Sequence, residues 1–312
     1  MRIVLVGASG FFGKHLINAL TAHQHECIVL TRDAARHGDL RLFRGVELRQ
    51  TDVYDADVLA AQFAGADAVV SMAGILNESG YRGRGFHKVH VELVETIIHA
   101  CQQAGVSRVL HVSALHAGNG SSHYLRTKGE AEELLRSASD LNVTIFQPSV
   151  IFGRGDSFFN RFASILKLTP VLPLACPKAR LQPVFSDDVA AAITSSLEDA
   201  MTWGESYELA GPENFTLKEL VEWTANCMGL RRWVIGLPAP LSASQALLMG
   251  LVPGKPFSWD NYQSLKTDNT TRHNGFAYFG IYPRPIDSVV ADYLNGSIHQ
   301  RRLQSFRRMA GR

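Results

Sequence analysis

Three closely spaced glycines after a short apolar strand constrain this chain more than any other feature. The strand is expected over Arg2–Val6, the glycines fall within Gly7–Gly13, and Leu16, Ile17 and Leu20 follow at helical spacing. A strand, a tight turn and a helix N-terminus bind a pyrophosphate, because the helix dipole and its free N–H groups attract negative charge. The sequence therefore predicts a dinucleotide at this turn, and the alternative is a glycine-rich turn without a ligand.

Length and composition set the class of protein but not its partners. The chain has 312 residues, of which 46% are hydrophobic, and this is enough for one large or two modest domains. A net charge of +2 gives no indication of a nucleic-acid partner. The last fourteen residues carry no acid and five arginines, which we interpret as a solvated terminus rather than a contact for an anionic surface: Arg301, Arg302, Arg307, Arg308 and Arg312.

The cysteines and the apolar segments indicate a protein of a reducing compartment. No Cys-x-x-Cys pair or zinc-spaced histidine accompanies the four cysteines, so we expect neither a disulfide framework nor a metal: Cys27, Cys101, Cys176 and Cys227. The pairs His87/His90 and His111/His116 are interpreted as ordinary polar or core histidines. The N-terminal apolar run is too short for a signal peptide, and prolines interrupt Leu237–Val252, so we expect no membrane-spanning segment and a cytoplasmic location.

The first half of the chain alternates strands and helices. Strands are expected at Arg2–Val6, Glu26–Thr31, Val46–Gln50, Ala68–Met72, Arg108–Val112 and Val143–Phe146. Helices are expected at Gly13–Ala22, Asp57–Phe63, Lys88–Ala104 and Tyr124–Ser137. Repeated β-α units with short connections need a parallel sheet covered on both faces, and the right-handed crossover rule then gives a doubly wound α/β Rossmann fold.

The pattern changes after Pro148, where prolines become frequent and regular alternation stops. Elements expected there are a helix capped by Ser186-Asp187-Asp188 and running to Leu197, a strand at Ser206–Leu209, and a helix over Leu217–Met228 with a Thr216/Glu219 capping box. We interpret 1–150 as the dinucleotide-binding domain, to which 184–205 returns, and 151–183 with 206–312 as a smaller, interleaved C-terminal substrate domain. The apolar segment Leu247–Val252 either lines a substrate pocket or packs this smaller domain.

A tyrosine and a lysine four residues apart are the clearest candidates for catalysis. Tyr124 and Lys128 fall on one face of an expected helix, so the ammonium can lie close to the phenol. A cation there lowers the pKa of the tyrosine and positions a cofactor ribose, which makes the phenol a usable acid or base. Chance pairs of this spacing are common, but this pair follows a strand that ends in Val112-Ser113, behind a dinucleotide motif.

Several motifs resemble those of the extended or atypical short-chain dehydrogenase/reductase superfamily, in its NAD-dependent epimerase/dehydratase family. Within that family, the sequence is similar to the subgroup related to the NADPH-binding accessory subunit of respiratory complex I. The resemblance runs nearly end to end, and its carriers are Gly7–Gly13, Tyr124–Lys128, Gln147–Gly153, Gln182–Ala190, Tyr207–Pro212 and Gly280–Pro283.

The resemblance implies a role for each matching residue. Tyr124 would be the acid/base and Lys128 the cation that binds the cofactor ribose. The residues implied around the cofactor are, for the pyrophosphate, Gly7, Ser9, Gly10, Phe11, Phe12 and Gly13; for the adenine, Asp52 and Val53; beyond the fourth strand, Ala73 and Gly74; and for the nicotinamide, Pro148 and Ser149.

One position departs from the family pattern. The catalytic serine or threonine of the family lies at the end of the fifth strand, where this chain has Ser113 followed by Ala114. If Ser113 fills the position, the proton relay has its usual hydroxyl. If Ala114 fills it, the relay lacks that hydroxyl, and Ser113 is a strand-end serine bonded to backbone.

The choice of cofactor depends on the end of the second strand. An acid there serves the ribose hydroxyls of NAD, whereas a 2′-phosphate needs an arginine. Arg32 follows the strand directly and Arg36 is nearby, so we favour NADP(H) over NAD(H). Asp33 is the alternative, as a ligand for a ribose hydroxyl, with both arginines as solvated surface groups.

Two functions of different classes follow. The first is an NAD(P)-dependent oxidoreductase of the epimerase/dehydratase type, in which Tyr124 exchanges the proton, with Lys128 and Ser113, on a small alcohol, a carbonyl or a sugar nucleotide. The second is a non-catalytic, NADPH-binding structural or assembly protein. We expect a small-molecule substrate as partner, and relatives suggest a homodimer or a larger complex. A third idea is a peripheral membrane or complex partner that uses the basic tail and the apolar 247–252 segment.

Overall fold

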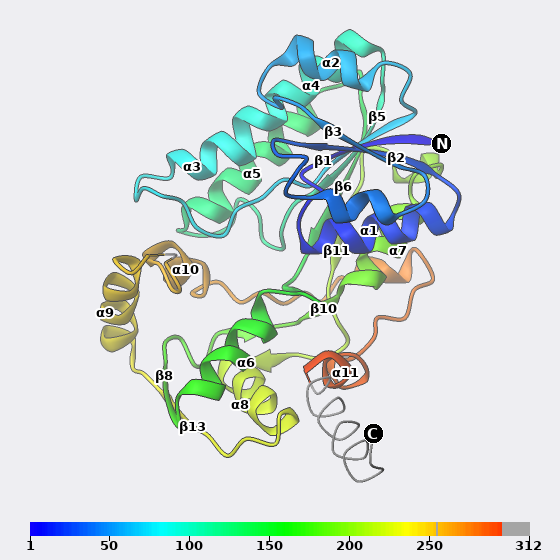
Figure 1. Cartoon of the computed structure of the whole chain (residues 1–312). Coiled ribbons are helices and arrows are strands. Elements are labelled where there is room, and N and C mark those ends of the chain that lie inside the picture. The colour runs from blue at the N-terminus through cyan, green and yellow to red at the C-terminus, as the bar shows by residue number, and fades with distance from the viewer. Residues whose placement is uncertain (254, 295–312) are drawn as a thin grey trace, which may run out of the picture.

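Seven parallel strands form the central sheet of the molecule (Figure 1). The computed structural model describes residues 1–253 and 255–294, so the arginine-rich tail lies outside the described residues. The strands have the order β11-β6-β5-β4-β1-β2-β3. Their bounds are β1 Arg2–Val6, β2 Glu26–Thr31, β3 Val46–Gln50, β4 Ala68–Ser71, β5 Arg108–Val112, β6 Asn142–Pro148 and β11 Ser206–Leu209. The reversal of order beside β1 confirms the doubly wound Rossmann fold.

Helices cover both faces of this sheet, which is why its inner strands β1, β2 and β4 are largely apolar and buried. Successive residues of a strand point to opposite faces, so Ile3 and Leu5 belong to one core and Val4 and Val6 to the other. The first core is closed by α1 Phe11–Ala22 and α7 Ser186–Ser195. The second is closed by α2 Ala56–Phe63, α4 Leu93–Ala104 and α5 His123–Ser137 (Figure 1).

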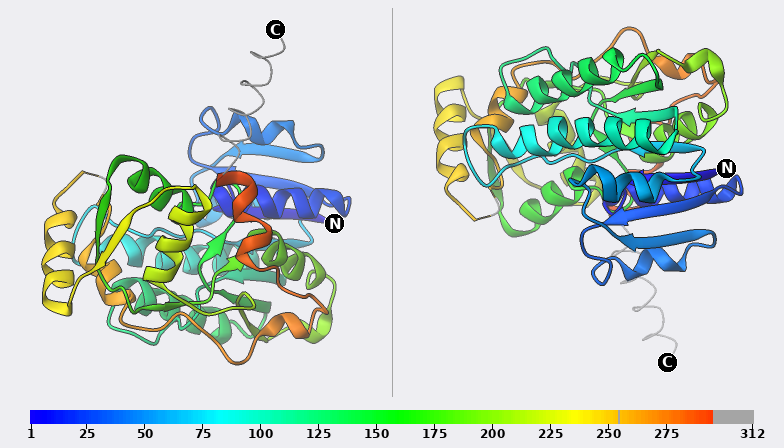
Figure 2. Two further views of the ribbon diagram at one scale, coloured as in Figure 1. Left: turned by 90° about the horizontal axis from the view of Figure 1, so that it is seen from below. Right: turned by 90° about the horizontal axis from the view of Figure 1, so that it is seen from above.

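A smaller lobe lies beyond the carboxyl ends of the strands (Figure 1). It contains three two-stranded sheets: β7 Ile151–Phe152 with β10 Val184–Phe185, β9 Arg180–Leu181 with β12 Phe215–Thr216, and β8 Val171–Leu174 with β13 Trp233–Gly236. Its helices are α6 Phe158–Leu168, α8 Leu217–Cys227, α9 Ala239–Gly250, α10 Trp259–Ser264 and α11 Val290–Leu294. Both views in Figure 2 place α9 at the outer edge of the molecule.

Shorter helical segments connect these elements. They are η1 Gly38–Leu42, α3 Arg84–His87, the π-helix η2 Lys88–Glu92, η3 Ala200–Thr202, η4 Gly275–Ala277 and η5 Ile286–Ser288. The helix expected from Lys88 therefore begins at Arg84 and includes a π-turn, which buries His90 and Val91. One stripe of this helix is apolar and buried, and it consists of Val91, Val94, Ile98 and Cys101.

Two other expectations meet different outcomes. The Thr216/Glu219 capping box is confirmed, with both reciprocal hydrogen bonds present. The cap at Ser186 is wrong, because Phe185 is the N-cap and Ser186 is already helical. The two acids that follow have specific partners instead: Asp187 bonds His15, and Asp188 forms an ion pair with Arg284.

Candidate dinucleotide and acid–base site

The three glycines of the first turn differ in what their backbone must accommodate. Gly7 has a φ of 89°, and a Cβ there would lie 2.5 Å from the backbone nitrogen of Ala73. A Cβ at Gly13 would lie 1.9 Å from the Ala8 carbonyl oxygen, because α1 packs directly against the turn that leads into it. A Cβ at Gly10 would meet no described atom within 4 Å. Two glycines are thus required by packing, and the middle one faces open space.

The N-terminus of α1 follows this opening. Gly10 is its N-cap and brings no side-chain hydrogen bond, and the first turn contains no acid. The first N–H groups of the helix are therefore open to an anionic ligand. Ser9, Phe11 and Phe12 are half-buried around the turn, and the Phe11 ring meets the His15 ring edge-on at 5.0 Å. The arrangement fits a pyrophosphate.

The end of β2 carries the residues that bear on cofactor choice. Arg32, Asp33 and Arg36 are exposed. The Asp33 carboxylate accepts a hydrogen bond from the Arg36 backbone N–H at 3.1 Å, so it is engaged in closing its own turn. Neither guanidinium has an acidic partner within 1–253 and 255–294.

The end of β3 lies beside them. The Asp52 carboxylate accepts from the Tyr54 N–H at 3.0 Å, and Val53 is buried in the second core. The Lys88 ammonium lies 4.8 Å from the centre of the Tyr54 ring. Asp52 therefore supports the turn, and its neighbour Tyr54 offers an aromatic face beside a cation.

Lys128 is a buried cation between two strand ends. Its Nζ donates to the Val112 carbonyl at 3.0 Å and to the Ala73 carbonyl at 3.5 Å. A Cβ on Gly74 would lie 3.6 Å from the same nitrogen. Burial lowers the pKa of Lys128 to about 8, against the opposing charge of Glu132. The lysine thus joins the ends of β4 and β5 at the edge where the glycine turn lies.

Tyr124 lies one turn before Lys128, at the start of α5. Its ring is half-buried and meets the rings of His90 and Phe86 edge-on, and its hydroxyl has no hydrogen-bond partner in the described part of the chain. The pKa of Tyr124 is raised by burial to about 12. The predicted lowering of this pKa is therefore wrong for the protein without ligands, because the Lys128 ammonium is directed at backbone carbonyls instead.

His90 contacts the Tyr124 ring and feels the charge of Lys128, and it was not predicted as a site residue. Its Nε2 accepts from the Ile75 N–H at 3.4 Å, so its Nδ1 donates to the Thr127 hydroxyl at 2.9 Å. Burial and the nearby Lys128 charge lower the pKa of His90 to about 2, which keeps the ring neutral. Its only signal in the sequence is the expected burial of a core histidine.

Ser113 follows the last residue of β5 and is buried together with Ala114. The Ser113 N–H donates to the Phe146 carbonyl at 2.7 Å, but its hydroxyl has no partner among the described residues. A buried hydroxyl without a partner costs free energy unless a bound group satisfies it. The interpretation of Ser113 as a serine whose side chain bonds backbone is therefore wrong.

The end of β6 is held by a residue far along the chain. Ser149 donates from its hydroxyl to the Asn269 side-chain oxygen at 2.5 Å, and the Val150 N–H donates to the same oxygen at 3.1 Å. Pro148 is buried. Similarly, the Asp260 carboxylate accepts from the Tyr124 N–H at 3.2 Å. Asn269 and Asp260 had no local signal in the sequence.

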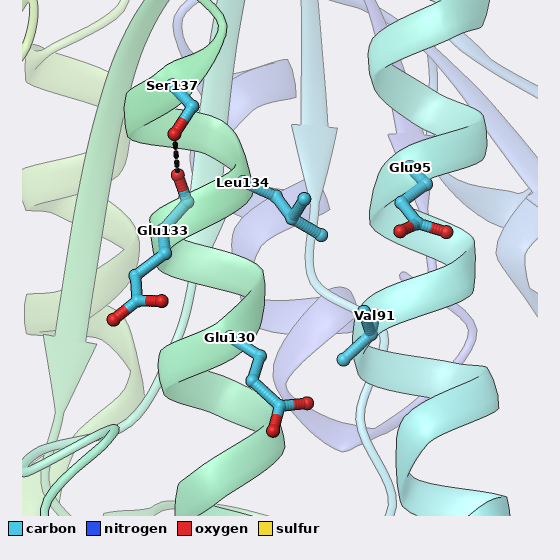
Figure 3. A pocket seen from close by; sticks show the side chains of 6 residues that line it. All are labelled: Val91, Glu95, Glu130, Glu133, Leu134 and Ser137. Atoms are coloured by element: carbon cyan, nitrogen blue, oxygen red, sulfur yellow. Dashed lines mark hydrogen bonds between the residues drawn. The ribbon is translucent and has the colours of Figure 1, made fainter.

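A surface hollow on the outer side of α4 and α5 is a different feature from this site. Figure 3 shows three glutamates among its lining side chains: Val91, Glu95, Glu130, Glu133, Leu134 and Ser137. Their negative charge does not suit a pyrophosphate. The predicted cofactor residues lie instead around the carboxyl ends of β1, β2, β3, β4 and β6.

The described part of the chain has neither a cluster of metal ligands nor a helix that could span a membrane. Over residues 1–253 and 255–294, no three His, Cys, Asp or Glu side chains come together as a metal site. None of the helices in the described chain is both long and apolar enough to cross a bilayer.

Known proteins are similar to this chain over most of its length. The NAD(P)H-binding family matches residues 7–157. The mitochondrial NADH dehydrogenase (ubiquinone) 1 alpha subcomplex subunit 9 of Arabidopsis thaliana is 31% identical over 92% of this chain and 76% of its own. The ceramide reductase of Caulobacter vibrioides is 27% identical over 76% of this chain and 74% of its own.

A solved structure extends the similarity to the fold as a whole. The NADPH-dependent quinone oxidoreductase of Escherichia coli, complexed with NADPH, has a TM-score of 0.73 at 20% identity and covers 95% of this chain and 99% of its own. This likeness shows a shared fold, and the sequence relatives confirm the predicted resemblance. The chain belongs to the family of the NADH dehydrogenase (ubiquinone) 1 alpha subcomplex subunit 9.

Proposed function

We propose that this protein is an NADP(H)-dependent oxidoreductase that uses Tyr124 as its acid. The observation that carries the proposal is the position of Lys128, buried between the ends of β4 and β5 and one helical turn from an unpartnered tyrosine hydroxyl. A buried ammonium is costly unless it has a task or full pairing. A ribose hydroxyl beside Gly74 would complete its hydrogen bonds.

The bound nicotinamide supplies or accepts a hydride, and the residues of the chain manage the proton. Because burial raises the pKa of Tyr124 to about 12, the phenol is protonated at neutral pH and can donate to a substrate carbonyl oxygen. The unpartnered Ser113 hydroxyl donates a second hydrogen bond to the same oxygen. Neutral His90 fixes Thr127, and with it the helical turn that carries Tyr124 and Lys128. The substrate class is a small alcohol, a carbonyl compound or a sugar nucleotide.

The preference for NADP(H) rests on the end of β2. Arg32 and Arg36 are exposed cations without acidic partners in the described residues, and the only acid between them is engaged with the Arg36 N–H. A 2′-phosphate can accept charge-assisted hydrogen bonds from both guanidinium groups. A ribose hydroxyl would have to compete for Asp33.

A non-catalytic, NADPH-binding role is the second candidate. The 31% identity to a subunit of NADH dehydrogenase supports it, because such a protein can hold a dinucleotide as part of an assembly. The high pKa of Tyr124 supports it too, since a phenol of this pKa is a poor base for the oxidation direction. Both candidates share the same cofactor site.

Turnover with a matched pair of tyrosine variants separates the two candidates. NADPH oxidation is measured over a panel of ketones, aldehydes and quinones with the wild type, Tyr124→Phe and Tyr282→Phe, the last being an exposed tyrosine. An enzyme loses about 10²-fold or more in kcat only in Tyr124→Phe, with an unchanged Kd for NADPH. Tight NADPH binding without any Tyr124-dependent turnover supports the structural role.

The location, the partners and the domain boundaries complete the proposal. We place the protein in the cytoplasm, because the spacing of its cysteines in the sequence is not that of a disulfide framework. The relative from Arabidopsis thaliana is named as mitochondrial, so cell fractionation is the test. A homodimer through α4 and α5, and the division into 1–150 with 184–205 and 151–183 with 206–312, rest on the family resemblance and on sequence pattern.

A further inference from the structure

Helix α9 of the smaller lobe buries its small residues and exposes its large apolar ones. Its buried stripe consists of small residues, Ser242, Ala246 and Gly250, at a spacing of four. The large apolar residues of α9 and its flanks are exposed instead: Trp233, Ile235, Leu241, Leu247, Leu248, Met249, Leu251 and Val252. A helix that packs on its own protein turns its apolar residues inward.

The exposure corrects both expectations for the segment Leu247–Val252. Leu248 is 65% exposed and Leu251 76%, so the segment neither lines a pocket nor packs the smaller lobe. An exposed apolar surface of this kind marks a contact with something outside the chain. The remaining question is the chemistry of that contact.

The charge of the surrounding lobe indicates the chemistry of the partner. The sequence has no acid between Asp156 and Asp187 and none between Glu222 and Asp260, although the whole chain has 29 acids. Together the two segments hold seven cations: Arg161, Lys167, Lys178, Arg180, Arg231, Arg232 and Lys255. These two segments, the acid-free surface, thus combine exposed apolar side chains with seven cations, and Asp268 and Glu219 of other segments lie near Arg180.

The fold brings cations and apolar side chains together. Arg232 donates from Nε to the Leu166 carbonyl at 2.6 Å, and the Trp233 N–H donates to Pro170 at 3.0 Å. The end of α6, with Lys167 and the 84%-exposed Leu168, therefore lies beside Arg232 and Trp233. An exposed tryptophan among cations and leucines is suited to the boundary between lipid headgroups and chains.

We propose that the acid-free surface docks on an anionic phospholipid bilayer, with the outer face of α9 at the acyl boundary and the cations at the phosphates. Two copies of the surface would bring its cations together, which disfavours a second copy as the occupant.

The docking surface is fixed to the dinucleotide-binding lobe by side chains near α9. The Tyr81 hydroxyl donates to the Gly250 carbonyl at 3.0 Å, and the Lys255 ammonium donates to the Gly80 carbonyl at 2.7 Å. Both partners are in the segment that follows β4. Docking therefore holds the whole molecule, and the inference does not depend on whether the site is catalytic.

Vesicle flotation of the full-length protein tests the proposal. Vesicles of phosphatidylcholine alone are compared with vesicles that contain about one third phosphatidylglycerol, at low and high salt. The protein is expected to float with the anionic vesicles and to be released by salt. Leu247→Ser/Leu248→Ser is expected to weaken binding about tenfold or more, and Arg231→Gln/Arg232→Gln to weaken it and reduce the salt dependence.

Matched controls keep the outcome clear. Leu42→Ser/Met201→Ser removes two exposed apolar side chains elsewhere and should bind as the wild type does, and thermal melts verify that every variant folds. Absence of flotation by the folded wild type overturns the proposal. An equal loss of vesicle binding in Leu247→Ser/Leu248→Ser and in the control Leu42→Ser/Met201→Ser also overturns it. So does a concentration-dependent dimer that Leu247→Ser/Leu248→Ser abolishes without any vesicle binding, since a second copy is then the occupant.

Discussion

Helices α1 and α9 have similar apolar compositions, but α1 buries its large apolar side chains and α9 exposes them. Helix α1 buries Leu16, Ile17 and Leu20 against the central sheet, whereas α9 buries Ser242, Ala246 and Gly250 and exposes its leucines. The difference follows from what precedes each helix. A strand of the seven-stranded sheet leads into α1, but α9 follows β13 of a two-stranded sheet, which has little surface to offer.

The comparison teaches that the surface available for packing decides which side chains an element buries. In the dinucleotide-binding lobe, even the cation Lys128 is buried, because the backbone carbonyls at the strand ends accept its hydrogen bonds. In the smaller lobe, α9 leaves its large apolar residues at the surface, although the core of the same lobe buries Phe152, Phe159 and Leu166. Matched substitutions in the two lobes can break or sharpen this contrast.

Truncating one leucine in each helix is expected to have the largest effect. Leu16→Ala leaves a cavity in a fully buried position and should lower the free energy of unfolding by about 2–5 kcal/mol. Leu247→Ala removes an exposed side chain and should change it by less than about 0.5 kcal/mol. Urea unfolding of both variants provides the measurement. A cost above 2 kcal/mol for Leu247→Ala would show that α9 packs inward in solution.

A buried and an exposed lysine should differ in their pH dependence. Burial lowers the pKa of folded Lys128 to about 8 from 10.5, so between these values the unfolded chain binds more protons and the stability rises with pH. Relative to Lys128→Met, the wild type should gain about 3 kcal/mol across this window. Below pH 8 the difference between the two proteins should be constant.

Lys167→Met is the matched control in the smaller lobe. Lys167 is exposed, so the difference between wild type and this variant should stay flat over the same pH range. Denaturant titrations at pH 7 to 11 give both curves. A flat difference for Lys128→Met would contradict the burial of an uncompensated ammonium.

A methyl group on one glycine of each helix is expected to have the smallest effects, of opposite sign. Gly13→Ala should cost about 1–3 kcal/mol, because its Cβ would lie 1.9 Å from a backbone oxygen. At Gly250 the nearest atom, in Tyr81, is 3.9 Å from the Cβ position, so alanine should be neutral or stabilise by up to about 1 kcal/mol. Melting temperatures of both variants are the readout, and destabilisation by Gly250→Ala would mean that α9 is packed more tightly than described.

The dinucleotide-binding lobe could be predicted from the sequence because its signals are local. Strand bounds agree to within two residues, and the glycine turn with Tyr124 and Lys128 could be recognised from spacing within a few residues. Helix α1 begins two residues earlier than expected, since Gly10 is its N-cap. The sheet edge then brings together ends of strands that are far apart in the chain.

The remaining features depend on contacts between distant segments. Asp260 reaches the Tyr124 N–H across 136 positions, and Asn269 reaches the Ser149 hydroxyl across 120. No periodicity or spacing encodes such pairs. The direction of the Tyr124 pKa was also missed, because it depends on where the Lys128 ammonium points rather than on the spacing of the two residues.

The central claim is that a dinucleotide binds at the glycine turn with its 2′-phosphate on Arg32 and Arg36. Parallel titrations with NADPH and NADH test this claim most directly. The account predicts that NADPH binds at least about tenfold more tightly, since charged hydrogen bonds contribute about 1.5–3 kcal/mol each. The preference should disappear in Arg32→Ala/Arg36→Ala and persist in Arg44→Ala, a nearby exposed control. Tighter binding of NADH, or a preference for NADPH that survives the double substitution, would contradict it.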